Sequence, residues 1–433
     1  MLVAAAAALI ITAPAQGAPA PARPLSPSDV KLARALDAYV KPLVERGDLS
    51  GQLLVARNGQ IMVERSFGFA NVELGSPITP ESRMCVASVT KPMTVLLALR
   101  LMEQKRIGYR DSIARWLPDF PEASHITIEH LLRHRSGIRH EIVPDSLATR
   151  PRTAAEMVEL AKKLPLDFTP GSKSSYSSGG FTVLARILEI ASRKTYAALL
   201  DEYLFGPLKM THSSHADAAA LLPGRTAAYV PGAHGLENAP PADFSGLAGA
   251  GSVWSTARDL HLFVQGVLTG QLGESMRQSF DRGGKLEFSG RTGGFKAYAD
   301  WDSATGLETI FVGNVMTGAP DLLRGVIPRL AADEAVPPPA LPALSEKGVS
   351  EELLRRYEGD FKLENGILLA LRVRDGVLWA NDWMMLPTAD GAFFSPRDYG
   401  LIRGVAGADG RIARLDWTQN GVVYPAPRVN DAR

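Results

Sequence analysis

The chain has 433 residues, which is long enough for two folded domains with a large core in at least one of them. Its formal net charge of +1 gives no attraction toward nucleic acid or an anionic membrane surface, so neither is expected as a partner. The single cysteine, Cys85, excludes an intramolecular disulfide and any metal site built from several cysteines.

The N-terminal stretch has the pattern of an export signal. Apolar residues dominate as far as Thr12, and small residues follow, with a cleavage site expected after Gly17. The stretch lacks a basic start and is too short to span a membrane. We therefore predict a signal peptide at residues 1–17, a disordered Pro/Ala-rich lead-in at 18–27, and a secreted or periplasmic protein.

The first folded elements predict a mixed α+β domain. Apolar residues at helical spacing indicate a helix from Ser28 to Val44, capped by Ser28 or Asp29. Two strand-like runs follow, Gly51–Arg57 and Gln60–Phe67. The Asn-Gly pair between them is the strongest short hairpin signal.

The next stretch carries a Ser-x-x-Lys pattern at the start of a buried helix. Apolar residues dominate from Val89 to Met102, and three-residue spacing places Ser88 and Lys91 on one helix face. A serine needs a nearby base to become a nucleophile, and desolvation turns a lysine into one. Taken alone, the spacing favours a capping serine and a solvated lysine, because such Ser/Lys spacings often arise by chance. Cys85 is expected to be a small core residue.

Three histidines lie close together after this helix, at positions 130, 134 and 140. No acidic or thiol ligand stands at useful spacing, so structural or surface roles are expected rather than a metal site. Thr127 is predicted to cap a short helix here, which Ser136-Gly137 would end.

A polar segment precedes the next apolar helix, which is predicted from Phe181 to Ser192. Tyr176 and Ser178 are expected in that loop, where site residues often lie. The alternative interpretation is a Ser/Gly-rich surface turn with a half-buried tyrosine.

Glycines flank an Arg-Thr pair later in the chain. Gly290 and Gly293-Gly294 stand on either side of Arg291-Thr292, an arrangement that permits close backbone approach by a ligand. Before them, residues 216–241 are predicted to be irregular loops around a cleft. Strands are expected at Ala297–Trp301 and Leu307–Asn314, and a helix at Leu322–Ala332.

The C-terminal part changes character after a proline-rich linker at residues 334–348. Short alternating runs separated by turn residues fill 349–433, after a short helix from Ser350 to Arg356. Repeated short strands at this spacing predict a small antiparallel barrel or sandwich.

Several stretches, in order, resemble the serine beta-lactamase and penicillin-binding protein superfamily, in the branch with class C beta-lactamases, D-alanyl-D-alanine carboxypeptidases and esterases. The resemblance implies a beta-lactamase/transpeptidase-like domain at residues 28–333, an antiparallel sheet with helices on both faces and a helical subdomain. The matching stretches are Gly68–Asn71, Pro77–Pro80, Ser88–Lys91, Leu131–Gly137, Pro170-Gly171, Tyr176–Phe181, Pro207–Met210 and Gly290–Phe295.

The resemblance implies that Ser88 is the nucleophile and that Lys91 and Tyr176 share its proton, with either as the base. It places the oxyanion donors at the amides of Ser88 and Gly294. Substrate binding falls to the residues around them: Ser178, Arg291, Thr292, Gly293 and Gly294. No metal or organic cofactor is required.

Two positions depart from the family pattern. Ser178 stands where the family has asparagine, and a hydroxyl donates one hydrogen bond where an amide both donates and accepts. Arg291 stands where the family has lysine or histidine, so it keeps a charge suited to a carboxylate but cannot give up a proton near neutral pH.

We expect a serine hydrolase that forms an acyl-enzyme from esters or D-amino-acid peptides, with a small-molecule or peptide substrate. The alternatives are a beta-lactamase or D-alanyl-D-alanine carboxypeptidase, and a catalytically weak binding or scaffold protein that keeps the cleft. The departures at Ser178 and Arg291 argue against efficient beta-lactam turnover. The sequence leaves the oligomeric state open.

Overall fold

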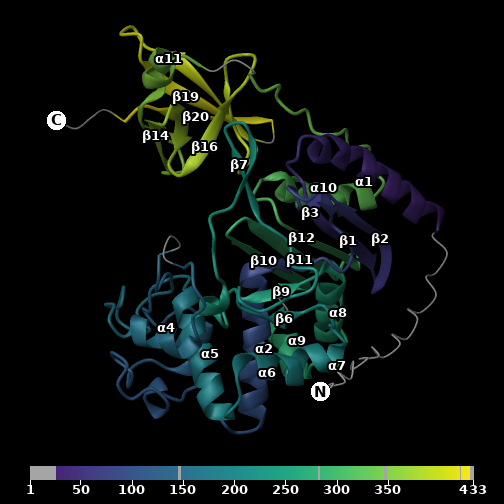
Figure 1. Cartoon of the computed structure of the whole chain (residues 1–433), viewed down its shortest axis with the longest axis vertical. Coiled ribbons are helices and arrows are strands. Elements are labelled where there is room, and N and C mark those ends of the chain that lie inside the picture. Colours follow the sequence, from purple (N-terminus) through teal and green to yellow (C-terminus); the bar gives the residue numbers. More distant parts are fainter. Residues whose placement is uncertain (1–25, 145–147, 281–282, 346–348, 420, 430–433) are drawn as a thin grey trace, which may run out of the picture.

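The structure is a computed structural model that describes residues 26–144, 148–280, 283–345, 349–419 and 421–429 (Figure 1). The predicted signal peptide, and the predicted lead-in as far as residue 25, lie outside the described residues. Within the described ranges, no helix is both long and apolar enough to cross a membrane.

A five-stranded antiparallel sheet organises the larger domain. The β1–β2 hairpin turns at Asn58 and Gly59, both with positive φ (51° and 77°), and its strands have the predicted bounds. β10 is an edge strand of the sheet. The strand order is β10 (Lys285–Thr292), β11 (Phe295–Asp302), β12 (Leu307–Gly313), β1 (Gly51–Arg57) and β2 (Gln60–Phe67).

Helices cover both faces of this sheet. Leu53 and Val55 of β1 pack with α1 and α10, whereas Leu54 and Ala56 belong to the core shared with α2 and α8. This two-residue alternation buries the central strands on both sides. The helices are α1 (Pro27–Glu45), α10 (Ala319–Ala331), α2 (Thr90–Glu103) and α8 (Ala257–Leu268).

The first helix begins earlier than predicted. Ser26, not Ser28 or Asp29, is the cap, because its hydroxyl accepts the Asp29 amide while the Asp29 carboxylate accepts the Ser26 amide. Pro27 then occupies the first helical position, where its missing N–H leaves no bond unmade.

Further helices form a subdomain on one side of α2 (Figure 1). Thr127 caps α3 as predicted, but the helix ends at Leu132, before Ser136-Gly137, and His134 already has a φ of +56°. The subdomain contains α3 (Ile128–Leu132), α4 (Ala154–Ala161), α5 (Ser178–Ser192) and α6 (Tyr196–Leu200). A π-helical turn (Asp201–Phe205) then leads to α7 (Gly206–Leu208), which lies beside α8 on the other side of α2 (Figure 1).

The segment predicted to be irregular, residues 216–241, contains a hairpin. Tertiary anchors order it: the Tyr229 amide donates to the Asn314 carbonyl at 2.9 Å, and the Tyr229 hydroxyl donates to the Glu73 carboxylate at 2.8 Å. The remaining elements of this domain are β7 (Tyr229–Gly232), β8 (Gly235–Asn238), β3 (Phe69–Asn71), β4 (Ser76–Pro77), β5 (Met84–Cys85), β6 (Ser214–His215), β9 (Val253–Ser255) and α9 (Glu274–Phe280).

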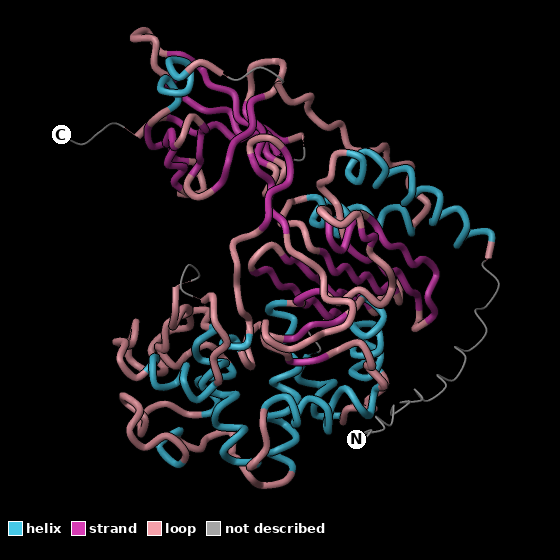
Figure 2. The backbone as a smooth tube through the Cα atoms, viewed as in Figure 1, coloured by secondary structure: helices cyan, strands magenta, loops and turns pink. Residues whose placement is uncertain are grey.

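The C-terminal residues form a nearly closed eight-stranded antiparallel barrel, seen as a separate group of strands in Figure 2. A bridge between Phe361 and Arg428 joins its first and last strands. The elements are α11 (Glu351–Tyr357), β13 (Gly359–Lys362), β14 (Leu368–Arg374), β15 (Val377–Ala380), β16 (Trp383–Pro387), β17 (Phe393–Ser395), β18 (Gly400–Ala406), β19 (Ile412–Gln419) and β20 (Val422–Pro427).

Candidate active site

Ser88 lies in a tight turn between a buried strand and a buried helix. The 3₁₀ turn Ala87–Val89 links β5 to α2, and Ala87 has a φ of +48°. A non-glycine residue in this conformation costs about 1–3 kcal/mol, so the surrounding packing must hold it. Such strain concentrates where a side chain has to be presented in one orientation.

Lys91 follows one helical turn later and is 6% exposed. Its Nζ lies 3.1 Å from Ser88 Oγ, 3.2 Å from Ser178 Oγ and 2.9 Å from the Ala250 carbonyl oxygen. All three partners are neutral. Burial therefore lowers the pKa of Lys91 to about 7, which leaves a substantial fraction of the amine unprotonated at neutral pH.

Tyr176 reaches the same hydroxyl from the segment before α5. Its OH lies 2.8 Å from Ser88 Oγ, and Lys91 Nζ lies 4.7 Å from the centre of its ring. Burial raises the pKa of Tyr176, although the hydrogen bond with Ser88 acts in the opposite direction. The Tyr176 phenol is therefore protonated at neutral pH and donates a hydrogen bond to Ser88 Oγ.

Two histidines hold the tyrosine in place. The rings of His134 and His140 lie 4.7 Å and 5.4 Å from the Tyr176 ring, and their Nδ1 atoms accept the backbone amides of Ser177 and Ser178, each at 3.2 Å. Burial first, and then the charge of Lys91, lowers the pKa of His134 to about 4, so its ring is neutral.

These contacts give the histidines a structural role, but sequence reasoning did not connect them to Tyr176. The two segments lie some 40 positions apart in the chain, and no local pattern pairs them. Within the described ranges, no group of three or more His, Cys, Asp or Glu side chains is arranged to hold a metal ion.

Ser178 lies in the first turn of α5, not in the loop that was predicted. The helix begins at Ser178 because Ser177 caps it, with the Ser177 hydroxyl accepting the Gly180 amide at 2.8 Å. This position turns the Ser178 hydroxyl toward Lys91. The Ser178 side chain is therefore held at the rigid end of a helix and not in a loop.

The edge strand β10 meets the nucleophile at Gly290. A Cβ atom built on Gly290 would lie 2.5 Å from both the Ser88 nitrogen and the Val86 carbonyl oxygen. Only glycine permits this backbone contact. From the sequence, we expected a ligand to approach Gly290 closely, whereas in the structure the nucleophile turn makes that approach.

Gly293 and Gly294 form the turn between β10 and β11, away from this contact. Thr292 pairs with Phe295, so the turn lies beyond the end of the ladder. A rise of about 3.3 Å per residue places it roughly 7 Å or more along the strand from Gly290. Cβ atoms built on the two glycines would meet Phe244 and Ala228. The structure thus brings Gly290 to Ser88, and not the predicted glycine pair.

Arg291 and Thr292 leave β10 on opposite faces. Thr292 shares the face of Gly290, because strand side chains alternate. Arg291 is exposed and pairs across the ladder with Lys296, which contacts the Thr317 carbonyl and Asp321 on the α10 side. The Arg291 backbone, however, directly follows the glycine that contacts Ser88.

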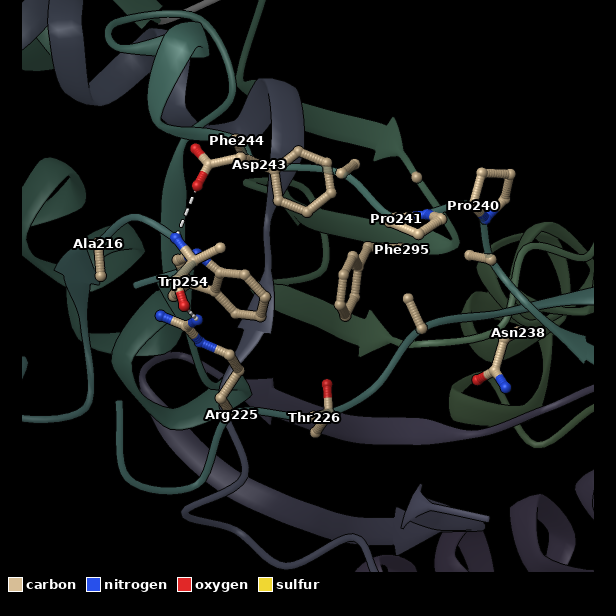
Figure 3. Close-up of a pocket in the computed structure, with 15 residues that line it drawn as sticks. Ala216, Arg225, Thr226, Asn238, Pro240, Pro241, Asp243, Phe244, Trp254 and Phe295 are labelled. Atoms are coloured by element: carbon tan, nitrogen blue, oxygen red, sulfur yellow. Dashed lines mark hydrogen bonds between the residues drawn. The ribbon is translucent and has the colours of Figure 1, made fainter. Parts of the chain in front are cut away.

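A cavity of about 240 Å³ lies beside the β10–β11 turn (Figure 3). Residues of the segment predicted to surround a cleft line it, together with Gly293. The aromatic rings of Trp254, Phe244 and Phe295 form one wall, and Arg225 stacks on Trp254 at 5.1 Å. This cavity suits an apolar group with a polar end.

Cys85 is fully buried, as predicted for a core residue. Its Sγ lies 3.3 Å from the Gly251 carbonyl oxygen. Burial raises the pKa of the thiol to about 12, so it carries no nucleophilic thiolate near neutral pH.

Comparison with known proteins gives a consistent set of relatives. Esterase EstB of Burkholderia gladioli is 32% identical over 198 residues, covering 41% of this chain and 50% of EstB. Penicillin-binding protein 4* of Bacillus subtilis is 31% identical over 188 residues, covering 41% of this chain and 40% of that protein. The chain spans about half the length of the curated relatives it matches.

Solved structures share the fold at lower identity. The D-amino acid amidase from Ochrobactrum anthropi SV3 superposes with a TM-score of 0.62 at 20% identity, covering 71% of this chain and 99% of that one. The octameric penicillin-binding protein homologue from Pyrococcus abyssi has a TM-score of 0.60 at 18% identity, covering 92% of this chain and 96% of that one.

The family model described as Beta-lactamase matches residues 36–325, which include the nucleophile turn, the tyrosine segment and the edge strand. This match covers well over half of the chain. The protein therefore belongs to the Beta-lactamase family.

Proposed function

We propose that this protein is a serine hydrolase that cleaves esters or D-amino-acid peptides through an acyl-enzyme. One observation carries the proposal: an amine with a pKa of about 7 and a phenol both lie within hydrogen-bond distance of Ser88 Oγ. The names of relatives, an esterase and a teichoic acid D-alanine hydrolase, support the same chemistry.

In the acylation step, the Ser88 oxygen attacks the carbonyl carbon and its proton passes to neutral Lys91. Lys91 is favoured over Tyr176 as the base because burial lowers the pKa of the amine and raises that of the phenol. Tyr176 then donates its proton to the leaving group and recovers one from Lys91. Cleavage of the acyl bond leaves an ester on Ser88.

The oxyanion needs two donors about 3 Å from one oxygen atom. We assign them to the backbone amides of Ser88 and Arg291. The contact at Gly290 supports Arg291, because its amide is the next one along β10, whereas the Gly294 amide lies too far along the hairpin. One such donor typically lowers the barrier by about 3 kcal/mol.

In deacylation, Tyr176 and Lys91 act in reverse and accept a proton from the attacking water. Ser178 Oγ, 3.2 Å from Lys91 Nζ, holds the amine within hydrogen-bond distance of Ser88 Oγ. Thr292, on the Ser88 face of β10, and Gly293, beside the cavity, border the substrate.

The test is whether Ser88→Ala loses the ability to be acylated and to hydrolyse esters. The variant should lose labelling by a fluorophosphonate probe and hydrolysis of p-nitrophenyl acetate. Ser279→Ala, at an exposed serine of α9, is the matched control and should keep both. Hydrolysis and labelling at the wild-type rate in Ser88→Ala would remove Ser88 from the mechanism.

Esters are proposed ahead of beta-lactams because the Ser178 hydroxyl offers one donor where the related enzymes use an amide. Nitrocefin turnover that exceeds ester turnover would favour a beta-lactamase. A stoichiometric burst without steady turnover, on every substrate tried, would favour a binding or scaffold protein that retains the cleft.

We also propose export to the periplasm or cell exterior, from the apolar stretch that ends in small residues before Ala18. Expression of the full chain in a Gram-negative host should give a processed product in the periplasmic fraction. An unprocessed cytoplasmic product would contradict the proposal.

A further inference from the structure

The barrel brings a second unpaired guanidinium to the edge strand of the hydrolase domain. Arg291 and Lys296 are cross-strand partners on β10 and β11. Lys296 Nζ donates to the Thr317 carbonyl at 3.0 Å, and the next residue, Gly318, donates its amide to the Pro396 carbonyl at 2.8 Å. Arg397 directly follows, so a barrel arginine comes close to the β10–β11 pair.

The barrel loop that carries Arg397 is fixed on the hydrolase domain. Tyr399 donates its hydroxyl to the Asp48 carboxylate, and Arg46 lies over the rings of Phe394 and Tyr399 at 4.7 Å and 5.5 Å. A Cβ atom on Gly318 would lie 2.9 Å from the Arg397 carbonyl oxygen. This tight interface determines where the Arg397 backbone stands relative to β10.

The side chains of the two arginines are not engaged in ion pairs within the described part of the chain. Among the residues that the structure describes, neither Arg291 nor Arg397 makes an ion pair or a side-chain hydrogen bond, and the Arg397 Nε atom is buried without a partner. The Arg397 guanidinium lies over the Trp383 ring, at 5.3 Å. Lys296, by contrast, is paired with Asp321.

The charges of this cluster act on one another. Burial, and then the charge of Arg291, lowers the pKa of Arg397, while Asp398 and Asp382 act against this. Burial also lowers the pKa of Lys296, with Arg291 and Arg397 contributing and Asp321 opposing. Of these three cations only Lys296 is ion-paired to a described residue, and like charges held close together favour an anion that binds between the other two.

We infer that Arg291 and the barrel residue Arg397 form an anion-binding subsite that recognises a carboxylate or phosphate group on the substrate. The inference rests on the proposed function, in which the Arg291 amide faces the scissile carbonyl, so an anion near that carbonyl comes within reach of the Arg291 side chain. The barrel would then be a specificity element of the hydrolase and not an independent module.

The test compares a charged with a neutral ester of similar shape. The ratio of kcat/KM for 3-carboxyphenyl acetate to that for phenyl acetate should exceed one in the wild type. Arg397→Gln keeps a side chain that can pack on Trp383 but removes the charge, and it should lower this ratio by about tenfold, mainly through KM. Arg397→Lys keeps the charge and should retain most of the preference.

Arg414→Gln is the matched control. Arg414 is an exposed barrel arginine on β19 paired with Asp416, so its loss changes the net charge equally without touching the cluster. It should leave the ratio at the wild-type value. Salt at about 1 M should reduce the wild-type preference, because the screening length falls to about 3 Å. An unchanged ratio in Arg397→Gln would overturn the inference.

Direct binding separates this inference from the proposed function. Calorimetry with benzoate and with phenyl phosphate should show binding that Arg397→Gln weakens about tenfold and that Arg414→Gln does not alter. If ester hydrolysis proves independent of Ser88, the proposed function fails, while Arg397-dependent binding of either anion still supports the subsite. Absence of binding, or binding independent of Arg397, would refute it.

Discussion

A carboxylate placed beside Lys91 should shift the pH dependence of acylation upward. Ser178 Oγ lies 3.2 Å from Lys91 Nζ, so Ser178→Asp puts an anion against a buried amine whose pKa has been lowered from 10.5 to about 7. That lowering corresponds to about 5 kcal/mol against the charged form. A carboxylate at this distance raises the pKa of a neighbouring amine by about 1–3 units.

The magnitude follows from the fraction of neutral amine. At pH 7 about half of Lys91 is neutral in the wild type. A pKa one unit higher leaves about one tenth of the amine neutral, and a pKa two units higher leaves about one hundredth. If neutral Lys91 is the base, a pKa rise of about one to three units should make acylation of Ser178→Asp at pH 7 about 5-fold to 500-fold slower than in the wild type. The deficit should shrink as the pH rises past the new pKa.

The assay is the second-order rate constant of fluorophosphonate labelling, measured from pH 5 to pH 10. The wild-type rate should rise through a midpoint near pH 7. Ser178→Asn, a neutral residue of similar size to aspartate, is the control and should keep that midpoint. An identical midpoint in Ser178→Asp, or a wild-type rate that rises as the pH falls, would show that neutral Lys91 is not the base.

Four further predictions test the packing around the site and at the interface with the barrel. Lys91→Met should abolish acylation and raise the free energy of unfolding at pH 7 by about 1–3 kcal/mol, measured by chemical denaturation. The folded state disfavours the lysine charge that the unfolded state keeps, so the gain in stability should vanish above about pH 10.5, where both states are neutral. His134→Phe keeps a ring beside Tyr176 but loses the acceptor of the Ser177 amide, so kcat should fall about tenfold with little change in KM. Gly290→Ala should slow labelling about 100-fold with far-ultraviolet circular dichroism unchanged, since its Cβ would lie 2.5 Å from backbone atoms at the nucleophile. Tyr399→Phe should destabilise the interface between barrel and hydrolase domain by about 1–3 kcal/mol in thermal denaturation, and wild-type stability would show that its hydrogen bond to Asp48 is not needed.

Local patterns predicted the elements that depend on near neighbours. The Asn58-Gly59 hairpin, the buried helix after Ser88 and the Thr127 cap depend on turn chemistry, periodicity and capping within a few residues, so they are readable in the sequence. Ser88 and Lys91 belong to the same class, because one helical turn separates them and sets their distance.

The tertiary structure decided everything that depends on distant segments. The contact of Gly290 with Ser88 joins residues about 200 positions apart, and alternation along β10, not motif position, determines which neighbours face the nucleophile. The same holds for the histidines that pack on Tyr176.

By itself, the sequence determined the chemical groups, a hydroxyl and an amine one turn apart with a phenol further on, because covalent spacing and helix geometry are local. Only the folded chain decided which backbone amide lies opposite the Ser88 hydroxyl, how far the Lys91 amine is shielded from water, and which domain supplies a second guanidinium. Those properties depend on burial and on strand register, which arise when segments far apart in the chain exclude water together.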